Sequence, residues 1–371
     1  MDNQEIVQIE EIESNKYIAC AACISVYADA ALWTASRGSE VKAISVHNNP
    51  SAPISLIVLG CQVTDLAVLN TLKIAAQLKR DLALGGSKDE VYIGGCLGSR
   101  LDIPMEYQGE TFKRVAPFSD TNRPFVPEKV SWRYPYWADS RADYKKSTSE
   151  DGWRFRDLYP IVTSRGCTKK CTYCTVRDLR PHTFYKDLVD ISNIGKLSSL
   201  FKKLKKSSAR TLLLTADSPS GEEIITWLDI IRNENSLFKN DESSNNLFDV
   251  ALRNVEPSVF VRIADELKND IQNGLISALH VPIQSIKQNI IEDMNGNWDA
   301  SKETIKIVKS IKSVFPTFPI YTNIIIDYKG MDTFADYQAV AKIFDSVSWN
   351  PYWDGKWDIN KAKARWKNYI G

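Results

Sequence analysis

Residues 163–177 read TSRGCTKKCTYCTVR and place three cysteines, Cys167, Cys171 and Cys174, within eight positions. The whole chain has 371 residues and seven cysteines, so this array is a local concentration of thiols. It directly follows YPIVTS at 159–164, a run typical of a buried β-strand. Basic residues surround the array, and nearby positive charge favours the thiolate form that binds metals. The stretch therefore predicts a metal centre on the loop after a strand.

From this array onward the sequence alternates between strand-like and helix-like runs. Six strand-plus-helix units are too few for the eight of a closed barrel, so we expect an open, partial (β/α)6 barrel. Ligands of such folds bind at the carboxyl ends of the strands, which is where the array lies. The predicted strands are 159–164, 210–216, 248–252, 276–283, 320–326 and 346–349, and the predicted helices are 186–206, 221–234, 257–268, 286–294, 300–314 and 333–344.

A shorter alternation precedes the array and predicts a small doubly wound domain, so the whole chain is assigned to the α/β class. Residues 104–158 interrupt the pattern with prolines, aromatic residues and a polar run, as an inter-domain connection does. We expect a first domain at 1–110, a linker at 111–158 and the barrel with its terminal segment at 159–371. The predicted strands of the first domain are 16–20, 41–45, 54–60 and 90–95, and its helices lie near 27–37 and 65–80.

Composition limits the classes of partner. The net charge is +1 and the isoelectric point is near 7.5, so no global charge marks a nucleic-acid or membrane-surface binder. No apolar run reaches the roughly 18 residues of a membrane span, and the acidic start MDNQEIVQIEEIESNK differs from a signal peptide. We expect a cytoplasmic protein, monomeric and without a membrane partner. Disulfides are rare in the cytosol, so clustered cysteines indicate metal or redox chemistry there.

Iron–sulfur and zinc both take soft thiolate ligands. A structural zinc site needs four protein ligands, and no second cysteine pair follows Cys174, although His182 could complete a Cys3His set. The three-residue gap between the first two cysteines is unusual for zinc. Three cysteines on a 4Fe-4S cluster would leave one iron open to a substrate or cofactor. Three buried structural cysteines are disfavoured, because the loop is polar and flanked by Arg165, Lys169, Lys170 and Arg177.

The C-x3-C-x2-C spacing, with Tyr173 before the third cysteine and a strand before the array, resembles the radical S-adenosylmethionine (SAM) superfamily. The resemblance implies that Cys167, Cys171 and Cys174 hold a 4Fe-4S cluster whose open iron chelates the amino and carboxylate groups of SAM. Reduction, by a protein such as flavodoxin or ferredoxin, then releases a 5'-deoxyadenosyl radical that abstracts a hydrogen atom. The cofactor carries the radical chemistry and the protein orients it.

The remaining cysteines follow predicted strands of the first domain, and the carboxyl ends of parallel strands converge on one edge of a sheet. An ordinary alternative is that they are small buried hydrophobes. The whole chain resembles the radical methylthiotransferases, in which three N-terminal cysteines hold a second 4Fe-4S cluster. Cys61 and Cys96 match the second and third of these. Cys23 matches the first better than Cys20, because Asp29 follows it by six residues.

The barrel sequence agrees with this family. HVPIQS at 280–285, followed by Met294, is similar to its H-x-P-x-Q-S motif and downstream methionine. NIIIDYKGMDTFADY occupies the place of a Gly-Phe-Pro-Gly-Glu-Thr turn and keeps Gly330 and Thr333. The chain departs from the family in Ala22 and Val26, which replace a glycine and an asparagine. The chain ends about 20 residues after the sixth predicted strand, where the family continues into a tRNA-associated TRAM barrel, so we expect that domain to be absent.

Four residues are expected to bind SAM. The resemblance places Tyr173 near the adenine, while Asp217 and Arg253 at predicted strand ends suit the amine, ribose or carboxylate of the cofactor. Gln284, at the end of the fourth predicted strand, has a similar role. Ordinary alternatives are a helix N-cap for Asp217, a surface ion pair for Arg253 and a buried amide for Gln284. No catalytic residue beyond the cluster ligands is identified.

The resemblance implies an enzyme that replaces an unactivated C–H bond with C–S–CH3. Known substrates of the family are a modified adenosine in tRNA and an aspartate side chain of a ribosomal protein. The low net charge favours a peptide or small-protein substrate, with tRNA methylthiolation as the alternative. A further alternative is a radical SAM enzyme whose second cluster serves sulfur insertion or electron relay without methyl transfer.

The terminal WNPYWDGKWDINKAKARWKNYIG, at 349–371, interleaves basic and aromatic residues. Such a pattern can bind RNA. The reading we favour is an amphipathic helix whose tryptophans pack on the barrel.

Overall fold

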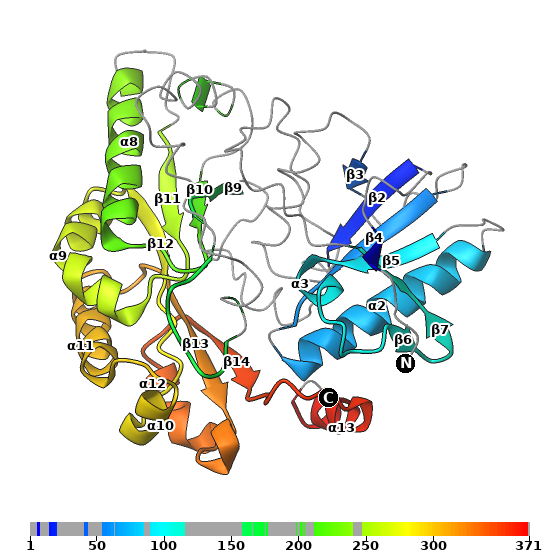
Figure 1. Ribbon diagram of the computed structural model, residues 1–371. Coiled ribbons are helices and arrows are strands. Elements are labelled where there is room, and N and C mark those ends of the chain that lie inside the picture. The colour runs from blue at the N-terminus through cyan, green and yellow to red at the C-terminus, as the bar shows by residue number, and fades with distance from the viewer. Residues whose placement is uncertain are drawn as a thin grey trace. The chain divides into compact units, whose positions relative to one another are not determined.

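The computed structural model divides the chain into two compact units, one of residues 1–146 and 353–371 and the other of residues 147–352 (Figure 1). Each unit has its own parallel sheet. The structure describes residues 6–7, 15–20, 41–43, 54–62, 64–84, 90–115, 158–164, 166–174, 176, 198, 201–202, 204, 211–239 and 247–369.

The first unit contains a six-stranded parallel sheet in the order β1-β8-β5-β4-β2-β3. The strand order reverses direction between β2 and β4, which makes a topological switch point there. Ligands of such sheets bind beside the switch point, at the carboxyl ends of the strands. The strands are β1 Ile6–Val7, β2 Asn15–Cys20, β3 Val41–Ala43, β4 Ile54–Gly60, β5 Glu90–Gly94 and β8 Lys113–Val115, and an antiparallel hairpin joins β6 Glu106–Tyr107 to β7 Glu110–Thr111.

The central strand β4, ISLIVLG, is apolar almost throughout, as expected for a parallel strand covered on both faces. Leu56, Ile57 and Val58 are fully buried accordingly. Sequence analysis ended this domain at residue 110, and β8 lies beyond that boundary. β8 was not predicted, because the three residues KRV show no strand-like alternation.

Three helices are described in the first unit: α2 Asp65–Leu84, α3 Gly95–Gly98 and α13 Ile359–Tyr369. α13 lies beside α2 (Figure 1). Trp357 and Trp366 pack against the core of this unit, so the expectation that the terminal tryptophans pack on the barrel is wrong. The spacing of Ile359, Ala362 and Trp366 predicts an apolar helix face, but such periodicity does not indicate which surface covers that face.

The second unit contains a six-stranded parallel sheet in which every strand pairs with its neighbour in the chain, in the order β14-β13-β12-β11-β10-β9. Such an order is that of a sheet wound in one direction, as in β/α barrels. The α/β class with parallel sheets is therefore confirmed. The strands are β9 Leu158–Val162, β10 Thr211–Thr215, β11 Asp249–Leu252, β12 Ile276–His280, β13 Ile320–Ile326 and β14 Ser346–Pro351.

The longer helices of this unit begin at clear capping signals. Pro257 occupies the first turn of α9, and the Glu256 carboxylate accepts bonds from the next two free backbone amides. The Asn297 side chain caps α11 by accepting the Ala300 N–H. The helices are α8 Gly221–Lys239, α9 Pro257–Gln272, α10 Gln288–Asp293, α11 Trp298–Val314 and α12 Gln338–Ala341, with short 3-10 turns η5 Tyr328–Gly330 and η6 Phe334–Tyr337.

One expected helix differs from the structure. The helix expected at 333–344 is divided into η6 and α12, because the capping box of Thr333 and Asp336 starts a tight 3-10 turn. The helix expected near 27–37 and most of that at 186–206 lie outside the described residues. Among the described helices, none combines the length and apolar character needed to cross a membrane.

Candidate functional site

The cysteine array forms a loop that directly follows β9. Gly166 has a φ of +83°, a conformation that favours glycine, and its N–H donates to Asp217 Oδ2 at 2.8 Å. Within the loop, Lys169 N–H donates to Cys167 Sγ at 3.3 Å and Cys174 N–H donates to the Cys171 carbonyl at 3.3 Å. These hydrogen bonds fix the conformation of the loop that carries the three thiols.

The end of α10 anchors this loop from the other side. Thr172 N–H donates to the Met294 carbonyl at 3.3 Å, and Thr172 Oγ1 donates to the Asp293 carbonyl at 3.0 Å. The Asn295 side-chain amide donates to the Lys170 carbonyl at 3.2 Å. The cysteine loop is thus held in place by residues more than a hundred positions later in the chain.

Tyr173 packs against a small apolar cluster beside the loop, formed by Ile290, Met294, Ile325 and Tyr328. Its hydroxyl also hydrogen-bonds Cys171. Burial raises the pKa of the Cys171 thiol, so metal binding at this position must release a proton.

The donor set of the loop consists of three thiols, two half-buried and one exposed. They lie close enough for the charge of one to raise the pKa of another. Within the described ranges, no three His, Cys, Asp or Glu side chains converge as a site for a single metal ion. A 4Fe-4S cluster is held by separate cysteine thiolates on different irons. The soft, accessible donors of this loop fit such a cluster in their chemistry.

Asp217 and Arg253 lie just past the ends of β10 and β11. Because Asp217 accepts the Gly166 N–H, its carboxylate is an anchor of the cysteine loop. Sequence analysis also considered Asp217 as a helix N-cap. At the start of α8 that role belongs to Ser220, whose Oγ accepts the Glu223 N–H at 3.1 Å. Arg253 is half-buried, and its N–H donates to the Leu214 carbonyl at 3.2 Å.

Arg253 lines a small pocket together with Thr163, Glu223 and Trp227. Both carboxylate oxygens of Glu223 and the indole nitrogen of Trp227 are buried there without a hydrogen-bond partner among the described atoms. Buried polar atoms are costly unless a partner satisfies them, so this pocket suits a small polar group or water. Sequence analysis missed Glu223 and Trp227, because their positions read as an ordinary helix start.

Gln284 connects two strands through its backbone. Its φ is +60°, its N–H donates to the Asn323 carbonyl at 3.0 Å, and its carbonyl accepts the Ile325 N–H at 2.8 Å. The Gln284 side chain is half-buried. The residue therefore lies beside β13, past the end of β12, in a backbone conformation that few residues other than glycine adopt.

His280 is the last residue of β12 and is buried. Its Nδ1 accepts the Asn254 N–H at 3.2 Å, and its ring also hydrogen-bonds the Asn323 side chain. Burial, with a smaller effect from the positive charge of Arg253, lowers the pKa of His280 to about 4. The imidazole is thus neutral at pH 7. Its hydrogen bonds connect the end of β12 to the residues after β11 and to β13.

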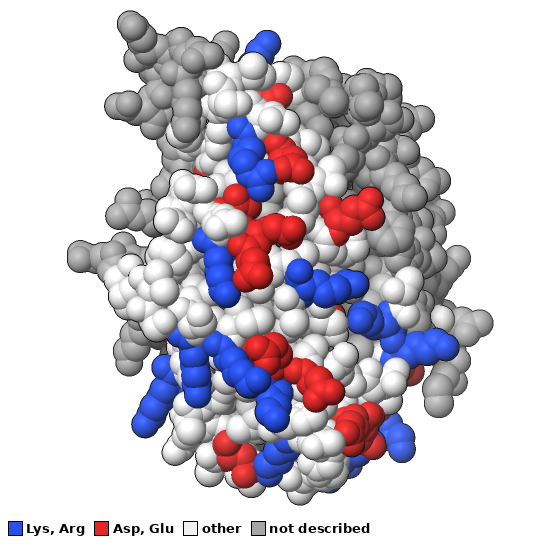
Figure 2. Space-filling view, turned by 90° about the vertical axis from the view of Figure 1, so that its left-hand side faces the viewer, with Lys and Arg blue, Asp and Glu red and all other residues white. Residues whose placement is uncertain are grey.

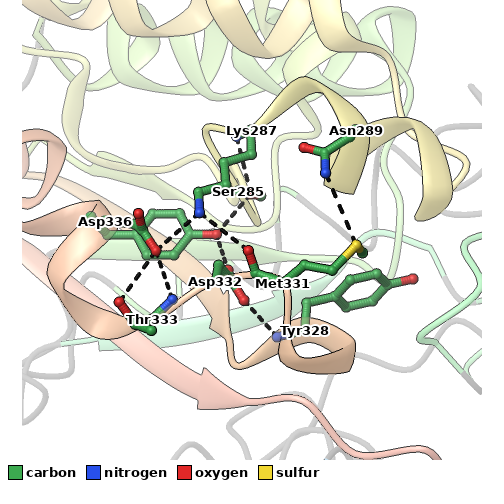
Figure 3. Close-up of polar contacts among 9 residues, drawn as sticks. Ser285, Lys287, Asn289, Tyr328, Met331, Asp332, Thr333 and Asp336 are labelled. Atoms are coloured by element: carbon green, nitrogen blue, oxygen red, sulfur yellow. Dashed lines mark hydrogen bonds and ion pairs between the residues drawn. The ribbon is translucent and has the colours of Figure 1, made fainter.

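The loop after β13 is held by a buried polar network (Figure 3). Asp332 Oδ1 accepts the Tyr328 N–H at 2.6 Å, and the Tyr337 hydroxyl bonds both Asp332 Oδ2 and Ser285 Oγ, the latter at 2.8 Å. Lys287 Nζ reaches the Met331 carbonyl at 3.2 Å. Sequence analysis identified this loop by Gly330 and Thr333 but missed its buried acid, because a lone Asp in a polar stretch carries no burial signal.

In the first unit, Cys61 and Cys96 follow the adjacent strands β4 and β5. The last residue of β4, Gly60, bridges to Gly95 across the two strands, and both cysteines are half-buried. A Cβ at Gly60 would lie 2.8 Å from the Leu97 Cβ, so only glycine allows this approach.

The third expected ligand of this unit, Cys23, lies outside the described residues. Cys20 is the last residue of β2, and only its backbone is described. β2 borders β4 at the switch point of the sheet, so the chain leaves β2 beside the end of β4 that carries Cys61.

Comparison with known proteins connects this arrangement to a family. Residues 161–334 match the family model of the Radical SAM superfamily. The chain is 24% identical over 293 residues to the ribosomal protein uS12 methylthiotransferase RimO of Carboxydothermus hydrogenoformans, covering 73% of this chain and 62% of that protein. It is 24% identical over 313 residues to the tRNA-2-methylthio-N(6)-dimethylallyladenosine synthase of Nitrosomonas eutropha, covering 77% and 66%.

A shorter match, 27% identical over 192 residues, relates the chain to a probable threonylcarbamoyladenosine tRNA methylthiotransferase of Pyrococcus abyssi, covering 51% of this chain and 42% of that protein. The chain thus spans less than two thirds of the length of the first curated relatives that it matches. Among solved structures, coproporphyrinogen III oxidase (HemN) from Escherichia coli aligns with a TM-score of 0.35 and 13% identity, covering 57% of this chain and 52% of that one, which is too weak for any argument.

Proposed function

We propose that this chain replaces an unactivated C–H bond of its substrate with C–S–CH3. Residues 161–334 match the Radical SAM superfamily model, and most of the chain is similar to methylthiotransferases. The observation that carries this proposal is the presence of two separate cysteine sets in one chain. One set occupies the anchored loop after β9, and the other follows the adjacent strands β4 and β5.

Cys167, Cys171 and Cys174 would hold a 4Fe-4S cluster, and the cluster would supply the electron that cleaves SAM into a hydrogen-abstracting radical. The surrounding residues fix the loop that presents the thiols. Asp217 holds its start through Gly166, and Thr172 ties its end to α10. This fixation limits the conformational entropy that must be lost when the reacting groups are brought together.

Four residues are the proposed contacts of SAM. Arg253 presents a half-buried guanidinium beside a pocket with unpaired polar atoms, and guanidinium groups bind carboxylates with two parallel hydrogen bonds. Asp217 lies at the start of the cysteine loop, and a carboxylate can accept hydrogen bonds from an amine or a hydroxyl. Tyr173 and Gln284 complete the set.

In the first unit, Cys61 and Cys96, together with Cys23, are the proposed ligands of a second 4Fe-4S cluster, which would hold the sulfur for transfer. Their thiols and the switch point of the sheet support this assignment. A second molecule of SAM is the proposed methyl donor. The first unit is thus assigned to sulfur and methyl transfer, and the second to radical formation.

A peptide or small protein is the proposed substrate. The chain has a net charge of +1, and basic and acidic side chains are interspersed over the face of the second unit seen in Figure 2. Binding of folded RNA draws on many phosphate contacts, which a mixed surface supplies poorly. tRNA is the second candidate, because two of the relatives above carry tRNA-modifying names.

Product analysis tests the reaction. After anaerobic reconstitution we expect about eight iron atoms per chain, as two 4Fe-4S clusters require. With a reductant such as flavodoxin or ferredoxin, SAM should yield both 5'-deoxyadenosine and S-adenosylhomocysteine. An enzyme that uses the second cluster for sulfur insertion or electron relay alone would form the first product without the second.

Substrate class is tested separately. The reconstituted enzyme is incubated with ribosomal proteins, peptides or bulk tRNA, and mass spectrometry then searches for a methylthio adduct. An adduct on a polypeptide supports the proposal, and an adduct confined to tRNA contradicts it. The monomeric state, the cytoplasmic location and the identity of the reductant stay predictions.

A further inference from the structure

Two charged residues of the first unit occupy equivalent places after Cys61 and Cys96. Asp65 is the fourth residue after Cys61, and Arg100 is the fourth after Cys96. Both are held by residues 353–369, here called the C-terminal segment, which belongs to the same unit.

The contact at Asp65 is a partly buried ion pair. The Asp65 side chain is 5% exposed, and Arg365 Nη1 on α13 lies 3.4 Å from both of its carboxylate oxygens. Burial raises the pKa of Asp65, while the positive charge of Arg365 opposes the rise. Since a buried carboxylate without its partner is strongly destabilising, Arg365 stabilises the turn that connects Cys61 to α2.

The contact at Arg100 involves both charge and aromatic packing. Arg100 Nη2 donates to the Gly355 carbonyl at 2.7 Å, and its guanidinium lies 5.1 Å from the ring centre of Trp353. The Arg100 carbonyl in turn accepts a bond of 2.6 Å from Arg114, which is buried. The loop that follows Cys96 is thus connected on one side to the C-terminal segment and on the other to β8.

Apolar packing fixes the segment itself. Ala362 is fully buried in the core of the first unit, and the tryptophan rings of the segment pack against that core. Lys73 of α2 lies 4.0 Å from the ring centre of Trp366, and Lys363 lies 5.6 Å from that of Tyr107. Several of its aromatic and basic side chains are therefore engaged within the unit.

We propose that the C-terminal segment positions the two cysteine loops of the first unit. Arg365 holds the loop of Cys61 through Asp65, and the backbone at Gly355 with the ring of Trp353 holds the loop of Cys96 through Arg100. A cluster that bridges two loops requires a constant separation between their thiols, and the segment sets it from a single rigid support. The inference rests on the proposed function only in taking Cys61 and Cys96 as cluster ligands.

The test replaces Arg365 and Trp353 by alanine in the full chain. After reconstitution the iron content should fall from about eight to about four atoms per chain. 5'-Deoxyadenosine should still form, since the radical cluster is untouched, while S-adenosylhomocysteine should be lost. The matched control is Lys361→Ala with Lys367→Ala, which removes two exposed charges from the same helix and should keep the full iron content.

A second readout does not depend on any cluster. In metal-free protein, the alkylation rates of Cys61 and Cys96 are measured by mass spectrometry, and both should rise in the Arg365 and Trp353 variant but not in the control. Circular dichroism must show a folded variant; if it does not, Arg365→Lys, which keeps the charge but not the guanidinium fork, is used instead.

Unchanged alkylation rates, or full iron content in a folded variant, would overturn the positioning role. If wild-type protein itself bound only about four irons, the proposed function would fail. The alkylation result would then still decide the role of the segment.

Discussion

Among single residues, Asp217 has a clearer role than a strand-end carboxylate would suggest, because it accepts the N–H of Gly166 directly before the first cysteine of the array. Asp217→Ala should weaken this anchor by about 1.5 to 3 kcal/mol, the range for a hydrogen bond to a charged group. The rate of 5'-deoxyadenosine formation should fall accordingly. Asp217→Asn keeps an oxygen acceptor and should retain more activity. Equal rates for wild type and the alanine variant would contradict the anchoring role.

Cys20 and Cys23 lie three residues apart, and only Cys23 is a proposed ligand. Cys20 ends β2 within the parallel sheet, whereas a ligand must lie beyond the strand end. Cys20→Ala should therefore keep the full iron content, and Cys23→Ala should lose about half of it. Iron and acid-labile sulfide assays measure both. The opposite pattern would assign the cluster to Cys20.

His280 makes the stability of the second unit dependent on pH. Its pKa in the folded protein, about 4, lies below the ordinary value, so its contribution is complete above about pH 6.5 and is lost as the pH falls toward 4. Between pH 7 and 5 the free energy of unfolding should decrease by up to about 2 kcal/mol from this residue. Urea denaturation at the two pH values measures the loss. His280→Gln should flatten this dependence, and an identical slope in the variant would contradict it.

At the level of elements, the loop between β13 and η6 depends on buried polar contacts. Tyr337→Phe removes the hydroxyl that bonds Asp332 and Ser285, leaving two buried groups each short of a partner. We expect a loss of about 1 to 3 kcal/mol in the free energy of unfolding, measured by urea denaturation. Ser313→Ala, an exposed hydroxyl on α11, is the control and should change stability by less than about 0.5 kcal/mol. A Tyr337→Phe variant as stable as this control would show that the network contributes little.

For the whole molecule, the dependence of RNA affinity on salt distinguishes the two substrate classes. Phosphate contacts release counterions, so a binder that relies on them loses affinity steeply as salt rises. With a net charge of +1 and contacts that engage Arg365 and Lys363 within the first unit, we expect only weak tRNA binding at about 50 mM salt and none at about 200 mM. Filter binding or fluorescence anisotropy measures it. Tight, salt-tolerant binding of one tRNA would instead favour the RNA substrate.

The sequence by itself determined the features that depend on local pattern. Strands such as β4 and β13 were predicted at their observed bounds, because continuous apolar runs between turn residues have few alternatives. The spacing of Cys167, Cys171 and Cys174 indicated the radical SAM family, whose model matches residues 161–334, because cysteine spacing is a property of the chain alone. The iron–sulfur site at these cysteines stays a prediction.

Only the tertiary structure decided which distant residues support these features. The packing of α13 on α2, the bond from Gly166 to Asp217 and the burial of Asp332 each join segments or surfaces that no local pattern relates. Periodicity shows that a helix has an apolar face, and composition shows that a loop carries an acid. Which surface covers the face, and which donor satisfies the acid, follows from the three-dimensional arrangement, because burial and hydrogen bonding depend on neighbours in space and not in sequence.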